Sequence, residues 1–249
     1  MIKEYNLLNV KLQALSPQSS KELLRSYLQS DSQHHLVTVN PEFIVAAQRN
    51  PEFKNILNES SLSTIDGTGI VQALKFFGHK VSLEDRLTGA QLLTKILEIA
   101  EYDHYKVMFL IYSKGLSKKD ELASRLEQIY PQLEYKISDE INCLTDVQTF
   151  PADILIVGLG APRQEFWINE YINQIPSVKI AIGVGGAIDF LSGAIKRAPK
   201  IFRSFGLEWF WRLIKQPHRL PRIFRAIFVF YFFLLKYKLS KIYAKKRNN

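Results

Sequence analysis

Two polar residues stand at the end of a short β-branched run early in the chain. Thr38 and Asn40 close the segment 35–39 and precede Pro41. Because they are two residues apart at a strand end, their side chains can point to one side. Both donate and accept hydrogen bonds, which suits sugar hydroxyls or a uracil ring. Asn40 could equally cap the helix expected after Pro41, and the spacing does not choose between these roles.

A carboxylate meets a glycine turn at Asp66-Gly-Thr-Gly69, directly after the run 63–65. Glycines let the backbone approach a ligand closely, and an aspartate in a dry pocket can act as a general base. The other interpretation makes Asp66 the N-cap of a helix over residues 68–77. Spacing alone favours the cap.

Arg86 comes just before a predicted helix start at Thr88-Gly89. Its guanidinium fork suits phosphate oxygens, and a helix N-terminus favours anions. An ion pair with the neighbouring acids Glu84 and Asp85 is an equally good interpretation. Arg86 is therefore one of two things: a phosphate ligand or half of a surface ion pair.

Two glycine-rich turns follow apolar runs later in the chain. The first, Gly158-Leu-Gly-Ala-Pro-Arg-Gln-Glu165, resembles a dinucleotide fingerprint only loosely, because Arg163 holds the third glycine position and no acid ends a following strand. A Rossmann NAD-dependent oxidoreductase is therefore a weakly supported alternative, whereas a phosphate or sugar fits this turn. The second, Gly183-Val-Gly-Gly-Ala-Ile-Asp189, is either a ligand contact or a place of tight packing. The candidate residues in the two turns are Gly160, Gln164, Gly185 and Gly186.

The elements that must position these residues alternate between strand and helix. Apolar runs predict strands at 35–39, 63–65, 106–112, 152–158 and 178–182. Helical patterns fall at 19–30, 42–50, 68–77, 90–100, 116–130 and 165–173. This order predicts an α/β fold with a Rossmann-like, mostly parallel sheet and helices on both faces. Ligands of such sheets bind beyond the carboxyl ends of the strands, where all the candidates above stand.

A net negative body carries a strongly basic tail. Residues 190–249 hold 15 Lys/Arg and one acid, Glu208, whereas residues 1–189 hold 18 Lys/Arg and 23 Asp/Glu. The tail also holds 14 of the 30 aromatic residues. This pattern favours a catalytic domain at 1–195 and a helical, basic appendage at 196–249 that meets an anionic surface. A nucleic-acid-binding protein is the alternative, but the rings gather in one run at 228–233 rather than in separate stacking platforms.

The longest apolar run, Ala226–Leu235, lies between Arg225 and Lys236. Ten helical residues rise about 15 Å, half of a bilayer's hydrocarbon core, so this run is too short to span a membrane. We expect a monotopic helix from about Ile223 on the cytoplasmic face of the cell membrane; packing on the body or on another subunit is the alternative. The expected apolar stripe comprises Ile223, Phe224, Ile227, Phe228, Tyr231, Leu234, Leu235 and Ile242.

The sequence offers little support for thiol or metal chemistry. The single cysteine, Cys143, lies in a polar stretch without a nearby histidine, which makes it a poor nucleophile. There is no Asp-x-Asp pair, no histidine cluster and no Cys/His spacing typical of a metal site, so no metal and no cofactor are expected. The N-terminus has no apolar signal core, so export is not expected.

Taken together, these segments resemble the WecG/TagA/CpsF glycosyltransferase family, family 26. The resemblance runs in order over residues 36–225, about three quarters of the chain. The matching stretches are Thr38–Glu42, Asp66–Val71, Arg86–Gly89, Gly158–Glu165, Gly183–Phe190, Gly193, Arg197–Pro199 and Gly206–Arg212. The final apolar and basic helix is less typical of the family.

The resemblance implies an inverting, metal-independent transfer of N-acetylmannosamine, or its uronic acid, from a UDP-sugar to a sugar on a polyprenyl diphosphate. Asp66 would be the general base, and Thr38, Asn40 and Gln164 would surround the reacting sugars. Arg86 would contact a diphosphate. Arg212, Arg219, Arg222 and Arg225 would be the lipid- or diphosphate-facing groups of the family's basic appendage. Gly160, Gly185, Gly186 and Arg197 complete the candidate binding residues. An anionic membrane surface is the expected partner, nucleic acid is not, and a homo-oligomer is compatible with the family's appendage.

Overall fold

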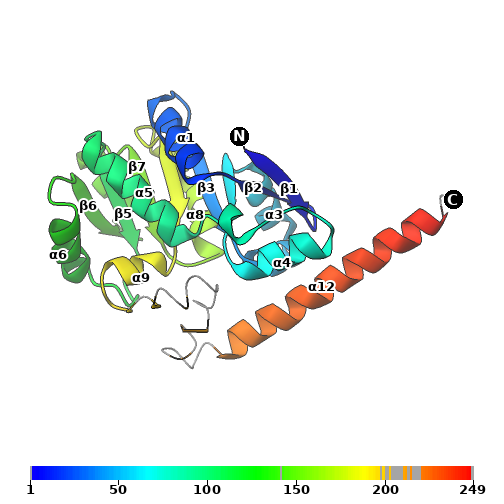
Figure 1. Cartoon of the computed structure of the whole chain (residues 1–249). Helices are drawn as coiled ribbons and strands as arrows, with labels where there is room; N and C mark the ends of the chain where they lie inside the picture. The colour runs from blue at the N-terminus through cyan, green and yellow to red at the C-terminus, as the bar shows by residue number, and fades with distance from the viewer. Residues whose placement is uncertain are drawn as a thin grey trace.

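The computed structural model covers the chain and describes residues 2–140, 142–196, 198–199, 202, 210–211, 214 and 220–247. Within these residues, an eight-stranded sheet has the order β1-β2-β4-β3-β8-β7-β5-β6. Figure 1 shows helices on both sides of this sheet and a long C-terminal helix beside it. The α/β class and the mostly parallel sheet expected from the sequence are confirmed.

Only the first pairing in the described sheet is antiparallel. β1 and β2 form a hairpin whose register joins Leu7 to Val10, and every other described pairing is parallel. The strands are β1 (Lys3–Leu7), β2 (Val10–Ala14), β3 (His34–Val39), β4 (Leu62–Ile65), β5 (Val107–Ile111), β6 (Tyr135–Asp139), β7 (Ile154–Gly158) and β8 (Ile180–Gly183). The parallel strands therefore bring their carboxyl ends to one edge.

Alternate residues of each central strand enter different hydrophobic cores. Leu36 packs into the core beneath α1 and α5, whereas its neighbour Val37 packs into the core beneath α2 and α3. Ile156 and Val157 divide in the same way, with Val157 in the core beneath α7 and α8. Because side chains alternate across a strand, a strand that is apolar at every position must be covered on both faces.

Several helices begin directly after a residue that caps their N-terminus. Asn40 and Asn50 stand at the N-caps of α2 and α3, and a proline occupies the first turn of each helix. The helices are α1 (Pro17–Gln29), α2 (Pro41–Arg49), α3 (Pro51–Glu59), α4 (Thr68–Phe76), α5 (Gly89–Tyr102), α6 (Lys119–Ile129), α7 (Cys143–Thr149), α8 (Arg163–Tyr171), α9 (Ala187–Leu191) and α12 (Leu220–Arg247). Two short 3₁₀ turns, η1 (Leu83–Asp85) and η2 (Ile172–Gln174), complete the described set.

Several elements were not expected from the apolar runs: β1, β2, α3, β6 and α7. Leu8 and Asn9 make the turn between β1 and β2 with positive φ angles of 52° and 63°, although neither is a glycine. β6 lies at the outer edge of the sheet, and its residues are mostly half-buried rather than continuously apolar. Apolar runs mark central strands better than edge strands, because only central strands are covered on both faces.

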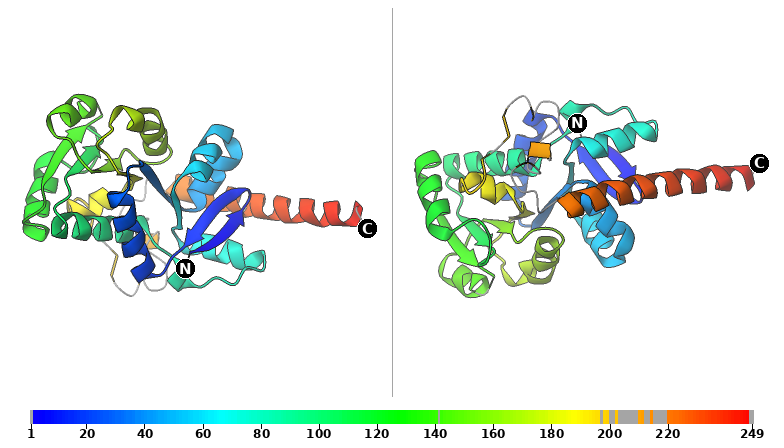
Figure 2. Two further views of the ribbon diagram at one scale, coloured as in Figure 1. Left: turned by 90° about the horizontal axis from the view of Figure 1, so that it is seen from above. Right: turned by 90° about the horizontal axis from the view of Figure 1, so that it is seen from below.

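The C-terminal helix α12 is attached to the body along one side. Phe230 and Leu234 are buried in the core that α2, α3 and α4 form with the sheet. Tyr231 donates its hydroxyl to Gln72 Oε1 over 3.0 Å, and Lys238 Nζ donates to the Phe76 carbonyl over 3.3 Å. Figure 2 shows the helix continuing past the body toward the C-terminus. Among the described residues, no helix is both long and apolar enough to cross a membrane.

Candidate active site

Four neighbouring strands carry the candidate residues to one edge of the sheet. β4, β3, β8 and β7 lie side by side in that order. Their carboxyl ends lead into Asp66, Asn40, the turn 183–186 and the turn 158–164, respectively. Residues that are up to about half the chain apart in sequence are therefore adjacent, as the strand-end rule predicts.

Asp66 is held by the start of a different helix from the one it precedes. The Gly89 N–H, the first of α5, donates to Asp66 Oδ2 over 3.0 Å. The N-cap position of α4 falls on Gly67, whose φ of +100° suits glycine, and not on Asp66. The N-cap interpretation of Asp66 at α4 is thus wrong in position. The half-buried carboxylate faces the junction of β4 and α5.

Thr38 lies beside this junction. It is 6% exposed, and a β-carbon added to Gly89 would lie 3.2 Å from Thr38 Oγ1 and 3.7 Å from Asp66 Oδ2. The loop before α5 is fixed to β4, because the Leu87 N–H donates to the Ile65 carbonyl over 3.1 Å. Thr38 and Asp66, expected to work together, are therefore brought together around the start of α5.

Asn40 performs the capping role that the sequence left open. Its Oδ1 accepts the backbone N–H groups of Glu42 over 2.9 Å and of Phe43 over 3.3 Å. The side-chain oxygen is therefore committed to α2, and the amide Nδ2 is the group that can face a ligand. Capping and ligand binding are compatible here, because they use different atoms of the same side chain.

Arg86 is available to an anion. It follows η1, and its Nε–H donates to the Leu83 carbonyl over 3.4 Å. Among the described residues Arg86 forms no ion pair. Its neighbour Asp85 pairs instead with Lys3 over 3.1 Å and accepts the Ser82 N–H over 2.7 Å. The structure thus gives no support to the alternative of an ion pair between Arg86 and its adjacent acids.

The N-terminus of α5 is largely satisfied within the protein. Asp66 accepts the Gly89 N–H, and the Thr88 hydroxyl accepts the Gln91 N–H over 3.3 Å. The Gln91 side chain returns the contact by accepting the Thr88 N–H over 3.0 Å. A phosphate at this place would therefore meet the Arg86 side chain rather than a row of unpaired helix N–H groups.

Gln164 connects the two glycine turns. Its Oε1 accepts the Gly160 N–H over 3.1 Å, and Gly160 has a φ of +78°. A β-carbon on Gly185 would lie 3.4 Å from the same oxygen, so the turn after β8 is in contact as well. Gln164 is only 2% exposed. The structure therefore places Gln164 beneath the turns at the carboxyl edge of the sheet, and Gly186, which follows Gly185, is the N-cap of α9.

Glu165 was not among the residues expected to matter. It is fully buried, and its Oε1 accepts the Gln164 Nε2–H over 2.6 Å. Burial raises the pKa of the Glu165 carboxyl to about 7. A signal was present in the sequence: Glu165 stands three residues before the buried Ile168, on the face that α8 turns to the sheet.

Sequence comparison decides the class of protein. A family model described as "Glycosyl transferase WecG/TagA/CpsF family" matches residues 5–243. The chain belongs to this family. Its place among glycosyltransferases gives no support to the oxidoreductase and nucleic-acid-binding alternatives.

Curated relatives match this WecG/TagA/CpsF member over most of their own length. One is the N-acetylglucosaminyldiphosphoundecaprenol N-acetyl-β-D-mannosaminyltransferase of Staphylococcus aureus strain MRSA252, which is 32% identical over 219 residues. That match covers 84% of this chain and 83% of the relative. A protein with the same name from Bacillus spizizenii is 31% identical over 204 residues, which are 80% of this chain and 77% of the relative.

The structure describes only part of the appendage arginines of this family member. Arg197, Arg212 and Arg219 lie outside the described residues. Arg222 and Arg225 lie in the first turns of α12, and their side chains are likewise outside the description. The expectation that these groups bind a lipid diphosphate, and the domain boundary at residue 195, therefore stay predictions.

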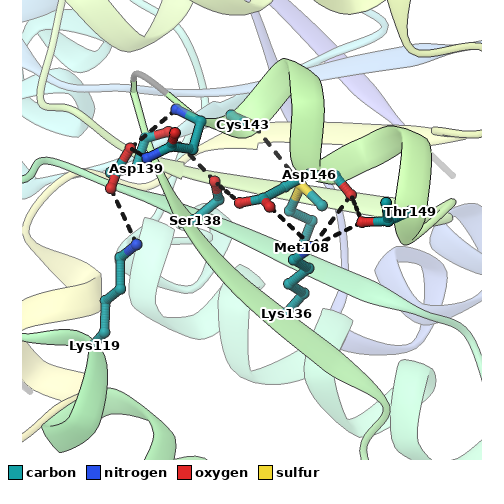
Figure 3. Close-up of polar contacts among 9 residues, drawn as sticks. Met108, Lys119, Lys136, Ser138, Asp139, Cys143, Asp146 and Thr149 are labelled. Atoms are coloured by element: carbon teal, nitrogen blue, oxygen red, sulfur yellow. Dashed lines mark hydrogen bonds and ion pairs between the residues drawn. The ribbon is translucent and has the colours of Figure 1, made fainter.

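The polar residues around α7 form a closed network at the outer edge of the sheet (Figure 3). Lys136 pairs with Asp146 over 2.9 Å, and the Ser138 hydroxyl donates to the same carboxylate over 2.6 Å. Cys143 is buried with its thiol 3.7 Å from Met108 Sδ, and burial raises its pKa to about 12. A thiol in this state is a poor nucleophile. The interpretation of Cys143 as inert is thereby supported.

Potential metal ligands are scattered in this glycosyltransferase. Among the described residues there is no group of three or more His, Cys, Asp or Glu side chains that could hold a metal ion. Asp66 directly follows β4, whereas Asp189 lies in α9, where its Oδ1 accepts the Ser117 hydroxyl over 2.8 Å.

Proposed function

We propose that this protein transfers N-acetylmannosamine, or its uronic acid, from a UDP-sugar to a sugar carried on a polyprenyl diphosphate. Family membership supports sugar transfer, and the names of the relatives supply the transferred sugar and a diphosphoundecaprenol-linked N-acetylglucosamine as acceptor. The UDP donor and the inversion of configuration are what the family resemblance implies. The product belongs to cell-surface polysaccharide synthesis.

The observation that carries the proposal is the position of Asp66. Its carboxylate lies at the carboxyl edge of the sheet, fixed by the Gly89 N–H and next to Thr38. In an inverting transfer, one base removes the proton of the acceptor hydroxyl while that oxygen bonds to the anomeric carbon. The bond from this carbon to UDP breaks at the same time. Asp66 is the carboxylate best placed to take that proton.

The charge of the departing UDP must be balanced at the same edge. A metal-free enzyme uses arginines and backbone N–H groups for this purpose. Arg86 forms no ion pair among the described residues and stands two positions before the α5 N-cap. We assign it to the diphosphate, with Gly160, Gly185 and Gly186 providing turns that a ligand can approach closely. The sugar contacts fall to Thr38, Gln164 and the Asn40 amide.

The second substrate is a lipid, and α12 offers a surface suited to a membrane. Its outward side exposes Phe224, Phe228, Tyr231, Phe232, Leu235, Leu239 and Tyr243. Lys236 and Lys241 are exposed on the same helix. Aromatic and aliphatic side chains enter the acyl boundary, while basic groups meet anionic headgroups. We propose peripheral attachment to the cytoplasmic face of the cell membrane through this side of α12.

One measurement tests the proposed reaction directly. The purified protein is incubated with a panel of UDP-sugars and a short polyprenyl-diphosphate-N-acetylglucosamine analogue. The masses of the products are then measured by mass spectrometry. The expected product has gained one N-acetylmannosamine, or one residue of its uronic acid, from the corresponding UDP-sugar and nothing from the gluco or galacto donors. No product from any donor, with a protein that is folded and binds UDP, would contradict the assignment.

A further inference from the structure

A buried acid lies directly behind the catalytic edge. Glu165 is fully buried on α8, and its Oε1 accepts the Gln164 Nε2–H over 2.6 Å. Its second oxygen, Oε2, has no hydrogen-bond partner among the described residues. An unpaired buried carboxylate is costly, whereas a neutral carboxyl in the same place costs much less. Burial accordingly raises the pKa of Glu165 to about 7.

The acid fixes which way the Gln164 amide points. Gln164 Oε1 accepts the Gly160 N–H over 3.1 Å, so the carbonyl end of the amide faces the turn after β7. The amide Nε2 must then face the Glu165 oxygen. A flipped amide would place two oxygens together and leave the Gly160 N–H opposite an NH₂ group. The Glu165 acceptor and the Gly160 donor thus select one orientation between them.

The same two side chains fill the space over the end of β8. A β-carbon added to Gly183 would lie 2.5 Å from Gln164 Nε2 and 2.6 Å from Glu165 Oε1. Such distances leave no room for a side chain at residue 183 while Gln164 and Glu165 keep these positions. The Gln164–Glu165 pair therefore connects the turn after β7 to the turn after β8, which carries Gly185 and Gly186.

We propose that Glu165 is a positioning residue for sugar transfer: it holds the Gln164 amide, and through it the Gly160 and Gly183–Gly186 turns, in the arrangement that binds the UDP portion of the donor. The inference rests on the proposed function. It adds a residue that contacts no substrate yet sets the geometry of those that do. Small displacements of such turns reduce binding and turnover without unfolding the protein.

Three substitutions separate positioning from bulk stability. Glu165→Gln keeps the shape and can offer the same acceptor oxygen to Gln164. Glu165→Asp keeps the acid but shortens the side chain by one methylene, so the contact to Nε2 is lost. Glu170→Gln changes an exposed acid on the same helix and serves as the matched control.

The experiment measures UDP affinity by calorimetry, donor KM and kcat by product formation, and folding by thermal unfolding. We expect Glu165→Asp to bind UDP about 10-fold to 100-fold more weakly and to raise the donor KM. Glu165→Gln should stay within about twofold of wild type, because the hydrogen bond is retained. The Glu170→Gln control should be unchanged in all three measurements.

The outcomes distinguish the inference from the function on which it rests. A folded Glu165→Asp protein with wild-type UDP affinity and KM would overturn the positioning role, whether or not its thermal stability had fallen. Equal losses in Glu165→Gln and Glu165→Asp would also overturn it, because the charge or the bulk of the group would then matter rather than the contact to Gln164. A wild-type protein that does not bind UDP would overturn the proposed function, and this inference with it.

Discussion

The Gly89 N–H donates to Asp66 Oδ2 over 3.0 Å and so joins two residues 23 positions apart in the sequence. Asp66 directly follows β4, and Gly89 begins α5. The contact ties one carboxylate oxygen of Asp66 to the start of α5. A base that must meet a hydroxyl in one geometry benefits from a backbone donor, because a backbone N–H has no rotamers to order.

Replacing Asp66 by asparagine is expected to lower turnover by about 10²–10⁴-fold while the fold is kept. Asparagine has the same shape, and its oxygen can still accept the Gly89 N–H, but it cannot take a proton. Steady-state sugar transfer with circular dichroism checks this outcome. Asp120→Asn, at an exposed acid in the first turn of α6, is the control. Near-wild-type turnover in a folded Asp66→Asn protein would remove Asp66 from the role of base.

Replacing Arg86 by alanine is expected to weaken UDP binding about tenfold or more, the usual loss for a charge-assisted hydrogen bond. Thermal stability should barely change, because the side chain is partly exposed and forms no ion pair among the described residues. Arg86→Lys should recover only part of the affinity, since an ammonium lacks the guanidinium fork. Arg125→Ala, on the exposed side of α6, is the control.

The appendage arginines are expected to serve a different anion, the diphosphate of the lipid acceptor. Single alanine variants at Arg212, Arg219, Arg222 and Arg225 should lower transfer to a lipid-linked acceptor without changing UDP affinity. Titration of the acceptor at saturating donor measures this effect. If these four variants and Arg86→Ala all kept full activity, arginine binding of both diphosphates would be wrong.

Transfer is expected to proceed without a divalent ion. The charge balance assigned to Arg86 and to the backbone N–H groups of the glycine turns requires no metal. Product formation in excess EDTA should therefore equal that in untreated enzyme. A loss of activity that Mg²⁺ or Mn²⁺ restores would show that the diphosphate is neutralised in another way.

The outward side of α12 is expected to bind anionic membranes. Changing Phe228, Phe232 and Leu235 to serine removes three side chains that are 60%, 60% and 55% exposed. Liposome flotation should then show at least about tenfold weaker partitioning, because each side chain loses apolar burial in the interface. The control changes three exposed apolar residues of the body to serine: Tyr102, Leu116 and Ile129. Equal flotation of the two triple variants would contradict attachment through α12.

Deletion of the tail is a poorer test of the same idea. The expected stripe placed Leu234 with the membrane-facing residues, but Leu234 and Phe230 are 2% and 1% exposed against the body. Truncation after Arg222 would uncover the core beneath α2 and cost about 1.5–3 kcal/mol for each lost side chain. A second copy of the chain is the other occupant for the outward side, and sedimentation of the serine variant would detect it as a change in mass.

The buried carboxyl of Glu165 predicts a stability difference that depends on pH. Its pKa is raised from 4.5 to about 7 in the folded protein, so the folded state keeps a proton that the unfolded state has lost between these values. The contribution of Glu165 to the free energy of unfolding is complete below pH 4.5 and is lost as the pH rises through 7. Urea unfolding at pH 4.5 and pH 8 should show wild type losing on the order of 3 kcal/mol relative to Glu165→Gln.

His35 acts in the opposite direction, so the comparison must be made against the variant. Burial lowers the pKa of His35 from 6.5 to about 4. The contribution of neutral His35 to the free energy of unfolding is therefore lost as the pH falls below 6.5 and through 4. The two effects partly cancel in wild type. Glu165 has no ion pair among the described residues, and Gln164 is its described side-chain hydrogen-bond partner. A pH-independent difference between wild type and Glu165→Gln would show that Glu165 is ionised when folded.

The central fold was predictable because β5, β7 and β8 are continuous apolar runs, and because β3 and β4 are β-branched runs that end at turn residues. β3, β4, β5, β7 and β8 were all expected, and their ends hold the candidate residues. The hairpin of β1 and β2 was missed because the turn at Leu8 and Asn9 lacks glycine. At the candidate site, the sequence predicted that Asp66 follows a strand but not that it contacts Gly89, because this contact depends on tertiary packing. Glu165 was missed because a glutamate is rarely fully buried, although its spacing from Ile168 places it on the inner face of α8.

Helix α2 has an end at the catalytic edge and a flank against the tail. It begins at Asn40, whose side chain caps it, and α12 packs along it. Nine helical residues, roughly 13 Å of rise, separate its two ends without a flexible joint. α2 therefore lies between the proposed sugar site and the helix proposed to lie on the membrane. If both proposals hold, one short helix sets the distance between the reacting sugars and the membrane surface.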